Sequence, residues 1–474
     1  MSFASIQFII FFVLSLAILI LAGCFKSKHS QKFSHIYLLI ASYVFYGWWD
    51  WRFCFLMLSL TAIAYITARQ LNGKYRKLFI TIGVSVPLIV LGIFKYLNFF
   101  LDSFSAAFGI ADLCSLNIIL PVGISFYTFQ SMSYTIDVYR GKIKAASFFD
   151  VALYVSFFPQ LVAGPIVKAQ EFLPQLKEER KVTLKGLEAG LQIFVMGMFK
   201  KIVLADRLSV FVDDVFATPT IFSTLTIILA VIAYALQIYF DFSGYSDMAI
   251  GCAKCIGYDI QWNFNLPYIS KNPTEFWKRW HISLSTWLQE YVYIPLGGNR
   301  KGKTRTYINL MLTMLIGGLW HGASWTFVVW GALHGIALCI HKLYLTVFSK
   351  KVRIPSIFAV IMNNIFVCVC WVFFRAPSFD IAIEILKKIF TWSSGVQQMY
   401  TWLFFALAIE MVYIIWSSRE SKKTKVTDSK FLVNAFYFHH NLNTVKGLLL
   451  FFLEIMATLG LAYTAASPFI YFQF

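Results

Sequence analysis

Two histidines stand inside an apolar and aromatic stretch, Gly-Gly-Leu-Trp-His-Gly-Ala-Ser-Trp-Thr-Phe-Val-Val-Trp-Gly-Ala-Leu-His-Gly, which runs from residue 317 to residue 335. They are His321 and His334. An imidazole has an ordinary pKa of about 6.5, so it can exchange a proton near neutral pH. A histidine in such a segment is either a buried hydrogen-bonding strut or a proton-transfer group. Glycines next to His321 permit non-helical backbone and close approach of a ligand, which favours a functional role there.

His334 has different neighbours. Gly331 and Gly335 flank it in a small-xxx-small pattern that is typical of closely packed helices. If residues 324–348 form one helix, His334 lies about 20 Å along the axis from His321 and roughly 140° around it. At that distance the two rings cannot share a proton or a metal ion. We therefore expect His334 to make a structural hydrogen bond.

A third histidine, His281, lies in a segment of mixed polarity. One apolar face is predicted there from three- and four-residue spacing of Phe276, Trp280, Leu284, Trp287 and Tyr291. Indole rings with basic residues off that face indicate an amphipathic helix along the membrane interface. Its predicted start has Asn272 as the cap, Pro273 at the first helical position and Glu275 in the first turn. His281 is either an interfacial anchor or a site residue.

Two carboxylates, Asp241 and Asp247, stand close to an apolar run, where an isolated charge is costly. They pair with other groups, cap a helix broken at Gly244, or face a cavity. The chain contains no phosphate-cradling loop, no nucleophile-elbow serine motif and no paired-histidine zinc motif. Cys252 and Cys255 are expected to be small apolar residues at a helix end. We expect no metal site and no tightly bound cofactor.

The elements that must position these residues are membrane helices. Of the 474 residues, 59% are hydrophobic and 14% are charged, whereas a soluble domain carries about 25% charged residues. Continuous apolar runs long enough to span a bilayer recur along the chain and favour helices over a β-barrel. Examples are 6–22, 78–94, 224–240, 357–374 and 448–463. We predict an all-α, polytopic membrane protein with roughly eleven to thirteen membrane-embedded helices.

The net charge of +18 does not indicate nucleic-acid binding, because lysine and arginine gather in short loops. These loops are 26–32, 69–77, 140–144, 177–185, 300–305, 350–353 and 419–430. Segments poor in positive charge alternate with several of them, at 101–114, 213–223 and 472–474. The positive-inside rule then places the basic loops, including the polar stretch 417–430, in the cytoplasm. Anionic lipid or an anionic acyl donor could use the same charges.

The first apolar run is predicted to be an uncleaved helix with the N-terminus outside. Its lysines follow the run, whereas a signal peptide has them before it. Because 300–305 and 350–353 are both expected in the cytoplasm, the chain between them enters the membrane and returns. His321 then lies at the turn. Non-helical backbone at membrane depth is tolerated only beside protein or a watery cavity, so His321 is expected to face a cavity.

Six motifs carry a resemblance to a known family. They are 46–52 (YGWWDWR), 158–165 (FPQLVAGP), 240–247 (FDFSGYSD), 275–287 (EFWKRWHISLSTW), 293–300 (YIPLGGNR) and 317–325 (GGLWHGASW). Together they resemble the membrane-bound O-acyltransferase family, in particular its bacterial alginate O-acetyltransferase-like branch. The resemblance implies a helical bundle around a tunnel. It also implies one membrane domain over 1–474, with a motif-bearing core at about 118–348 between N-terminal helices (1–117) and C-terminal helices (349–474).

The resemblance implies an activity as well. An acetyl group would pass from a cytoplasmic thioester, acetyl-CoA or an acyl-carrier thioester, toward hydroxyls of an exported or cell-wall polysaccharide. The transfer would be direct or through an extracytoplasmic SGNH-type partner, at the cytoplasmic (inner) membrane. The family's signature histidine corresponds to His321 and its second site position to His281. Residues that we expect to bind substrate or line the tunnel are Trp280, Trp320, Trp325, Asp241, Asp247, Asn299 and Arg300.

The chemistry of the residues agrees with this expectation. Acyl transfer needs a base for the hydroxyl proton, and a buried, neutral His321 suits that role. His321 could instead carry the acyl group covalently. Backbone N–H groups of Gly317, Gly318 or Gly322 are candidates for stabilising the developing oxyanion. His281 is expected to orient the donor or the acceptor near the cytoplasmic mouth.

Three alternatives stay open. The first is transfer of D-alanyl or another acyl group to a cell-envelope polymer within the same family. The second is a proton-coupled transporter, against which the lack of evident paired repeats counts. The third is a non-catalytic export scaffold.

Overall fold

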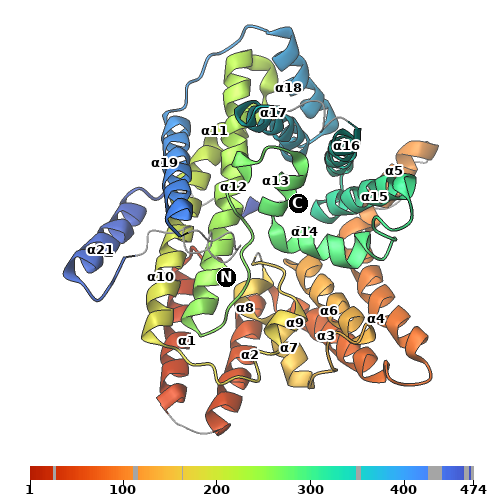
Figure 1. Cartoon of the computed structure of the whole chain (residues 1–474), viewed down its shortest axis with the longest axis vertical. Coiled ribbons are helices and arrows are strands. Elements are labelled where there is room, and N and C mark those ends of the chain that lie inside the picture. The colour runs from red at the N-terminus through yellow and green to blue at the C-terminus, as the bar shows by residue number, and fades with distance from the viewer. Residues whose placement is uncertain are drawn as a thin grey trace. The chain divides into compact units, whose positions relative to one another are not determined.

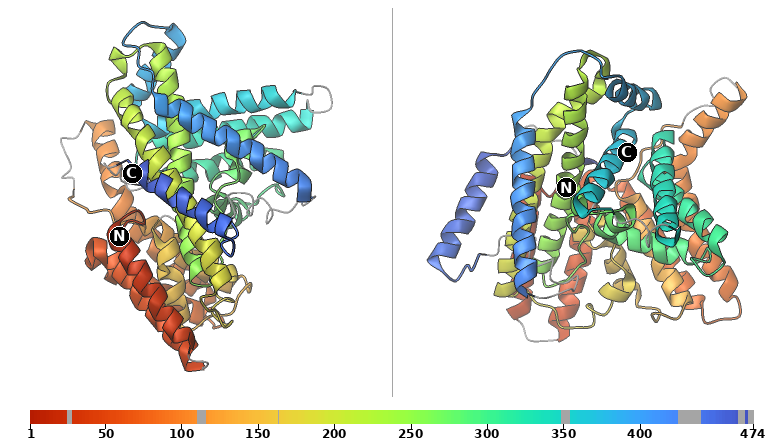
Figure 2. Two further views of the ribbon diagram at one scale, coloured as in Figure 1. Left: turned by 90° about the vertical axis from the view of Figure 1, so that its left-hand side faces the viewer. Right: turned by 45° about the horizontal axis from the view of Figure 1, so that its top comes forward.

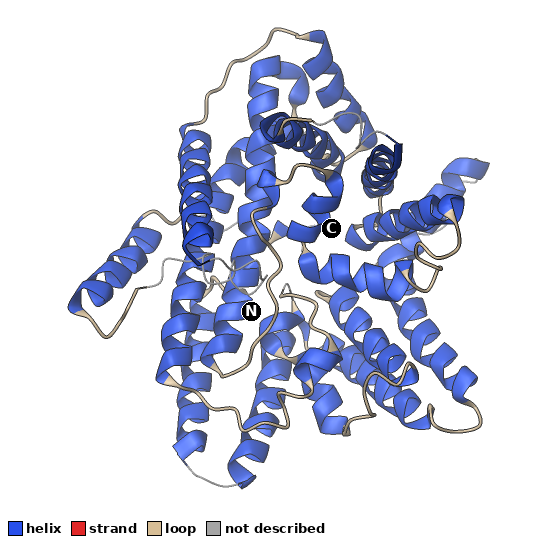
Figure 3. Ribbon diagram, in the orientation of Figure 1, coloured by secondary structure: helices blue, strands red, loops and turns tan. Residues whose placement is uncertain are grey.

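The fold is helical. A computed structural model describes residues 1–24, 28–109, 116–162, 164–347, 354–424, 440–463 and 469–470. Every regular element within these residues is a helix, as Figure 3 shows, and one isolated bridge joins Phe222 to Val396. The predicted all-α class is confirmed.

The described residues form two compact units, of which the first comprises 1–194 and 245–261. Its helices are α1 (Ile6–Cys24), α2 (Lys28–Asp50), α3 (Arg52–Gln70), α4 (Arg76–Leu91), η1 (Gly92–Tyr96), α5 (Leu97–Phe108), α6 (Ile124–Tyr139), α7 (Phe148–Ser156), α8 (Phe158–Leu161) and α9 (Ala169–Phe172). Helices α3, α4 and α6 pack against one another (Figure 1). They approach closely at Gly83, where an added Cβ would lie 2.7 Å from Thr135 Cγ2 and 2.8 Å from Thr67 Oγ1.

The second unit comprises 195–244 and 262–474. Its helices are η2 (Lys200–Ala205), α11 (Asp206–Ala217), η3 (Pro219–Ile221), η4 (Pro267–Ile269), α13 (Pro273–Arg279), α14 (Ile282–Leu288), η5 (Gln289–Tyr293), α15 (Lys303–His321), α16 (Trp325–Val347), α17 (Ser356–Arg375), α18 (Phe379–Thr391), α19 (Thr401–Thr424) and α21 (Val445–Gly460). Two helices, α10 (Leu184–Phe199) and α12 (Thr224–Cys255), run from one unit into the other.

Helices α15 and α16 form a closely packed hairpin in the second unit. An added Cβ would lie 2.3 Å from Phe327 O at Gly318 and 2.5 Å from Met314 O at Gly331. The predicted close packing at Gly331 and Gly335 is therefore confirmed. Helices α16 and α17 also run side by side, as Figure 2 shows.

Helix α12 is continuous over 32 residues, which excludes one of the three alternatives for Asp241 and Asp247, a helix broken at Gly244. An added Cβ at Gly244 would lie 2.6 Å from Gly197 O. The glycine therefore lets α12 approach α10 closely and does not bend the chain.

Six helices are long and apolar enough to cross a membrane within the part of the chain described above. They span Ile6–Cys24, Arg52–Gln70, Arg76–Phe108, Thr224–Cys255, Trp325–Val347 and Ser356–Arg375. Shorter apolar helices such as Thr401–Trp416 accompany them, and the larger predicted number of embedded helices stays a prediction. The organisation as one domain with a core at 118–348 also stays a prediction.

Part of the predicted loop at 417–430 is helical, since α19 continues to Thr424. The basic loop 350–353, the rest of the loop at 425–430 and the terminus at 472–474 lie outside the described residues. So do residues 26–27 and 110–114 of two other predicted segments, 26–32 and 101–114.

Candidate active site

His281 stands at a break between two short helices. The predicted helix start is confirmed, because Asn272 caps α13 and its Oδ1 accepts a hydrogen bond from Glu275 N at 2.8 Å. The predicted continuation to Tyr291 is wrong. The helix ends at Arg279, His281 adopts a left-handed conformation with φ +42°, and α14 begins at Ile282. A non-glycine residue in this conformation is uncommon, and such positions cluster at functional sites.

The aromatic face of this segment is buried within the second unit, whereas the sequence predicted an interfacial helix. Phe276, Trp280, Leu284, Trp287 and Tyr291 are all buried. Trp280 is in contact with Phe264 and Trp371, with ring centroids 5.0 Å and 4.9 Å apart. The period of four residues therefore marks core packing across two helices.

Asn263 fixes the orientation of the His281 ring. Its Oδ1 accepts hydrogen bonds from Ser283 N at 3.2 Å and Ser283 Oγ at 2.6 Å, and it lies 3.3 Å from His281 Nδ1. An amide oxygen only accepts, so Nδ1 of His281 is the protonated nitrogen and Nε2 carries the lone pair. His281 Nε2 is buried and has no hydrogen-bond partner within the described residues. The ring is thus oriented as a hydrogen-bond acceptor.

Burial also sets the charge of this ring. His281 is fully buried and lies outside the six candidate spans. Its ring is nearly perpendicular to the ring of Phe242, at 4.6 Å between centroids. Burial lowers the pKa of His281 to about 3, so the imidazole is neutral at pH 7.

His321 is the last residue of α15, at the turn of the α15–α16 hairpin. Gly322 follows in an extended conformation, and α16 begins at Trp325, so the predicted turn is confirmed. The His321 ring is 3% exposed and lies 4.9 Å from Trp320, 4.9 Å from Trp330 and 5.1 Å from Phe374, between ring centroids.

The indole ring of Trp320 is in contact with both candidate histidines. The Trp320 ring lies 4.9 Å from the His321 ring and 5.8 Å from the His281 ring, between centroids. Trp320 itself is buried. The structure therefore brings His281 and His321, which are 40 positions apart in the sequence, into one aromatic-walled cluster.

His334 makes the expected structural hydrogen bond. The indole N–H of Trp277 donates to His334 Nδ1 at 3.3 Å, and His334 is fully buried. The predicted separation of about 20 Å from His321 is wrong, because the Trp330 ring contacts both imidazoles at 4.9 Å and 4.8 Å. The prediction assumed that both histidines lie along one helix axis. In the structure His321 is the last residue of α15, His334 lies on α16, and α16 packs back along α15.

Comparisons with known proteins identify the family of this chain. The model of a family described as the membrane-bound O-acyltransferase family matches residues 4–381. The chain belongs to this family. It is therefore a multi-pass membrane enzyme, an O-acyltransferase.

Relatives of the acyltransferase carry three different names. This chain is 45% identical over 373 residues to the "Probable alginate O-acetylase AlgI" of Azotobacter vinelandii. The matched segment covers 76% of this chain and 73% of that protein. The chain is 38% identical over 387 residues to the "Peptidoglycan O-acetyltransferase" of Helicobacter pylori, covering 75% and 73%. A "Teichoic acid D-alanyltransferase" of Streptococcus thermophilus is 29% identical over 238 residues, covering 47% and 57%.

Other predicted site residues of the acyltransferase have different environments. Trp325, the first residue of α16, is 58% exposed, and its predicted role in substrate binding or in a tunnel wall stays a prediction. Asn299 and Arg300 are exposed in the loop before α15, and their predicted role in substrate binding stays a prediction.

The two predicted aspartates are both buried. Asp241 lies 2.5 Å from Lys201 Nζ and accepts a hydrogen bond from Ile470 N at 2.8 Å. Lys201 also lies 2.8 Å from Asp206 Oδ1. Of the alternatives considered for Asp241, the structure shows pairing with another charged group, Lys201. Asp247 is in the first unit, on the part of α12 that follows Gly244.

Two of the proposed oxyanion donors are not available. Gly317 and Gly318 lie inside α15, where backbone N–H groups bond to carbonyls four residues earlier. Gly322 follows the helix and is the candidate that is left.

Two residues of the site were not predicted from the sequence. They are Asn263, which orients His281, and Lys201, which pairs with Asp241. Asn263 lies 18 residues before His281 in an irregular segment, so no helical spacing connects the two. A signal for Lys201 did exist, because a lysine pair at 200–201 follows the apolar end of α10.

Proposed function

We propose that this enzyme transfers an acetyl group from a cytoplasmic thioester, acetyl-CoA, to hydroxyls of an exported or cell-wall polysaccharide. The observation that carries the proposal is the convergence of His281 and His321 on Trp320, with His281 Nε2 buried and without a hydrogen-bond partner within the described residues. The names of the relatives that match about three quarters of the chain support acetyl transfer.

In this proposal the two histidines have separate roles. Attack of an acceptor hydroxyl on the thioester carbonyl forms the ester and releases a thiol, while the hydroxyl proton leaves. His321 takes that proton as general base and returns it to the thiolate. His281 Nε2 accepts a hydrogen bond from the substrate and orients it for attack. Trp320, between them, excludes water from the reacting groups.

Acetyl is favoured over D-alanyl because of the extent of the match. The D-alanyltransferase relative covers 47% of the chain at 29% identity, whereas the alginate O-acetylase relative covers 76% at 45% identity. An acyl-carrier thioester is the alternative donor. Exposed Arg300 and the lysines of the same loop would attract the phosphates of coenzyme A.

The orientation in the membrane belongs to the same proposal. The basic loops face the cytoplasm and the N-terminus lies outside, in the cytoplasmic membrane. An extracytoplasmic SGNH-type protein would receive the acetyl group or complete its transfer to the polymer.

The deciding assay uses proteoliposomes that contain the purified enzyme. Acetyl-CoA labelled in the acetyl group is supplied on one side and a polysaccharide acceptor on the other. We expect label on the acceptor and at least a 100-fold loss in His321→Ala, which is the lower end of the usual contribution of a general base. His341→Ala, a histidine further along α16, is the matched control and should keep the activity.

Three other outcomes would contradict the proposal or its details. Movement of the acceptor without label would indicate a transporter. Unchanged acetylation in His321→Ala would indicate a scaffold. Trapping of acetylated His321 in the absence of acceptor would replace the general base with a covalent carrier.

A further inference from the structure

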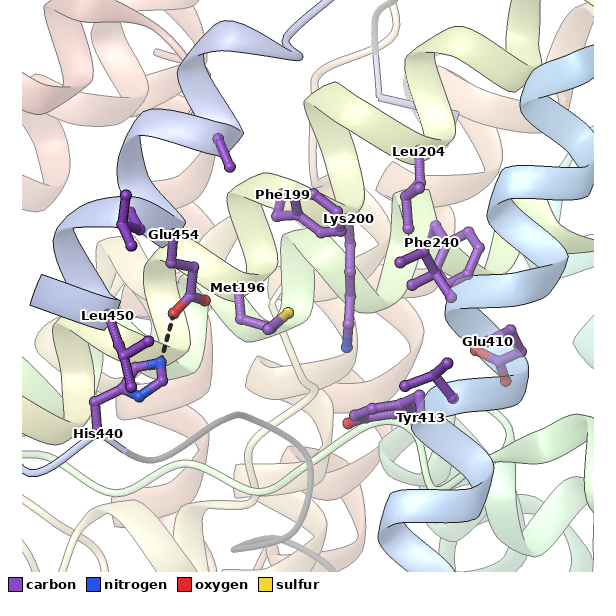
Figure 4. Close-up of a pocket in the computed structure, with 14 residues that line it drawn as sticks. Met196, Phe199, Lys200, Leu204, Phe240, Glu410, Tyr413, His440, Leu450 and Glu454 are labelled. Carbon is purple, nitrogen blue, oxygen red and sulfur yellow. Dashed lines mark hydrogen bonds and ion pairs between the residues drawn. The ribbon is translucent and has the colours of Figure 1, made fainter. Parts of the chain in front are cut away.

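The second unit contains a cavity whose lining includes neither His281 nor His321. It has a volume of about 400 Å³ and is bounded by α10, η2, α12, α19 and α21. Most of its wall is apolar. Figure 4 shows the exceptions: Lys200 extends into the middle, Glu410 stands on one side, and the His440–Glu454 pair stands on the other. No residue of this cavity takes part in the acyl transfer proposed above.

Glu410 is the group that points to a ligand. It lies in the apolar helix Thr401–Trp416 and is 6% exposed. Neither carboxylate oxygen has a hydrogen-bond partner within the described part of the chain. A buried carboxylate without hydrogen bonds is costly, and an ionisable residue in a membrane helix indicates a function. A ligand that donates hydrogen bonds or carries positive charge would remove this cost.

Lys200 supplies the opposite charge in the same cavity. Its ammonium lies 5.5 Å from the centroid of the Tyr413 ring, and the residue is 5% exposed. Its charge acts on Glu410, so the two groups are within electrostatic range. The cavity therefore offers one cationic and one anionic group.

The geometry of α21 explains why there is room for a ligand. Hydrogen bonds hold the residues just after the C-terminal end of α21 against η2 and α11. Arg207 of α11 donates to Leu461 O, and Tyr463 N donates to Ile202 O of η2. In the middle of α21, Leu450 and Leu453 line the cavity, and their side chains are 40% and 60% exposed. An apolar space between membrane helices is filled by hydrocarbon, because its walls would otherwise lose their packing contacts.

We propose that this cavity binds one zwitterionic phospholipid, with an acyl chain between α21 and α10 and the head group between Lys200 and Glu410. The phosphate accepts hydrogen bonds from the Lys200 ammonium, and a primary ammonium of the lipid donates to Glu410. His440 Nε2 and Glu454 Oε2 contact each other at 3.2 Å, so the proposal assigns the selection of the head group to Lys200 and Glu410. A purely anionic lipid would leave the Glu410 carboxylate opposed by like charge.

The test is lipid binding by the purified full-length enzyme, measured by native mass spectrometry after delipidation. The probes are phosphatidylethanolamine, phosphatidylglycerol and phosphatidylcholine. We expect one phosphatidylethanolamine per chain, held about tenfold more tightly than phosphatidylglycerol, the ratio that one charge-assisted hydrogen bond supplies. Phosphatidylcholine has no N–H to donate and should also bind about tenfold more weakly. Equal binding of all three would overturn the head-group assignment.

Variants locate the site. Glu410→Gln should remove the preference for phosphatidylethanolamine, and Leu450→Trp should fill the chain space and abolish the bound lipid. Leu449→Trp is the matched control, because Leu449 is 57% exposed and does not line the cavity. Retention of the lipid in Leu450→Trp would overturn the site. His321→Ala should bind the lipid normally, so this result is independent of the proposed acetyl transfer.

Discussion

The amide oxygen of Asn263 accepts from both hydrogen-bonding groups of Ser283 and from the His281 ring. These contacts give a neutral imidazole a defined tautomer in a fully buried position. Partners that orient a functional histidine typically change activity by about 10- to 100-fold when removed. At the scale of single residues, the site therefore depends on an asparagine outside every family motif quoted above.

We predict that Asn263→Ala lowers kcat by about 10- to 100-fold with a smaller change in KM, because the ring loses its orientation while the cluster keeps its shape. Steady-state acetyl transfer in proteoliposomes checks this expectation. Asn265→Ala is the control, since Asn265 contacts Arg279 and not His281. Equal effects of the two substitutions would contradict a positioning role for Asn263.

The neutral state of His281 predicts a pH-dependent stability. Burial lowers its pKa to about 3, whereas an unfolded histidine titrates near 6.5. The stabilisation is complete above about pH 6.5 and is lost as the pH falls toward 3, because only the unfolded state gains the proton. Between pH 7.5 and pH 5 the loss amounts to about 2 kcal/mol.

His281→Asn removes this titrating group, and asparagine tolerates the left-handed conformation. Thermal unfolding in detergent should show the wild type losing about 2 kcal/mol more than the variant over that pH range. Parallel pH curves for the two proteins would mean that His281 is solvated.

At the scale of elements, the α15–α16 hairpin decides where His321 lies. The two backbones are in close contact at Gly318 and Gly331. Leu288 of α14 packs against Gly317, where an added Cβ would lie 3.1 Å from Leu288 Cδ1. Small residues at such positions allow the close approach that membrane helices need in place of hydrophobic burial.

We predict that Gly331→Ala lowers the unfolding free energy by about 1–3 kcal/mol, because the new methyl group would meet the Met314 carbonyl. It should also lower activity by moving His321. Gly460→Ala is the control, since an added Cβ there has no neighbour within 4 Å. Melting temperature and acetyl transfer are measured on both variants; equal stability would show that the helices separate without cost.

The π-helical turn η2 contributes to another group of buried charges in this unit. Lys201 lies between Asp206 and Asp241, and burial raises the pKa of Asp206 to about 6 against the pull of that lysine. Lys201→Met would leave two buried carboxylates without a cation. We predict a loss of about 3–5 kcal/mol in the unfolding free energy.

Thermal unfolding of Lys201→Met checks this value. Lys181→Met is the control, because the Lys181–Glu179 pair is exposed and such pairs contribute about 0–1 kcal/mol. Adding Asp241→Asn to Lys201→Met should recover part of the loss. A double variant no more stable than Lys201→Met would show that the carboxylate charge is not the cause.

At the scale of the whole molecule, the charge pattern predicts how the chain crosses the membrane. Cysteines introduced at Arg300 and at Thr220, both in exposed segments, should react from opposite sides in a background without native cysteines. A membrane-impermeant thiol reagent added to intact cells should label Thr220→Cys and spare Arg300→Cys. Labelling of both from outside would contradict the proposed orientation.

Sequence patterns were sufficient to predict the membrane class, the all-α fold, the family, the cap at Asn272 and the turn at His321. Each of these depends on local spacing, on composition or on a contiguous motif. The close packing at Gly331 and Gly335 was also readable, because small residues at a four-residue interval lie on one helix face.

Tertiary structure alone decided the rest. The break at His281, the contacts of Asn263, Lys201 and Trp330, and the continuity of α12 through Gly244 depend on residues distant in the sequence. A four-residue period is the same for one long helix and for two short ones that bury one face. A glycine likewise permits both a bend and a close approach, and only the neighbouring helix distinguishes them.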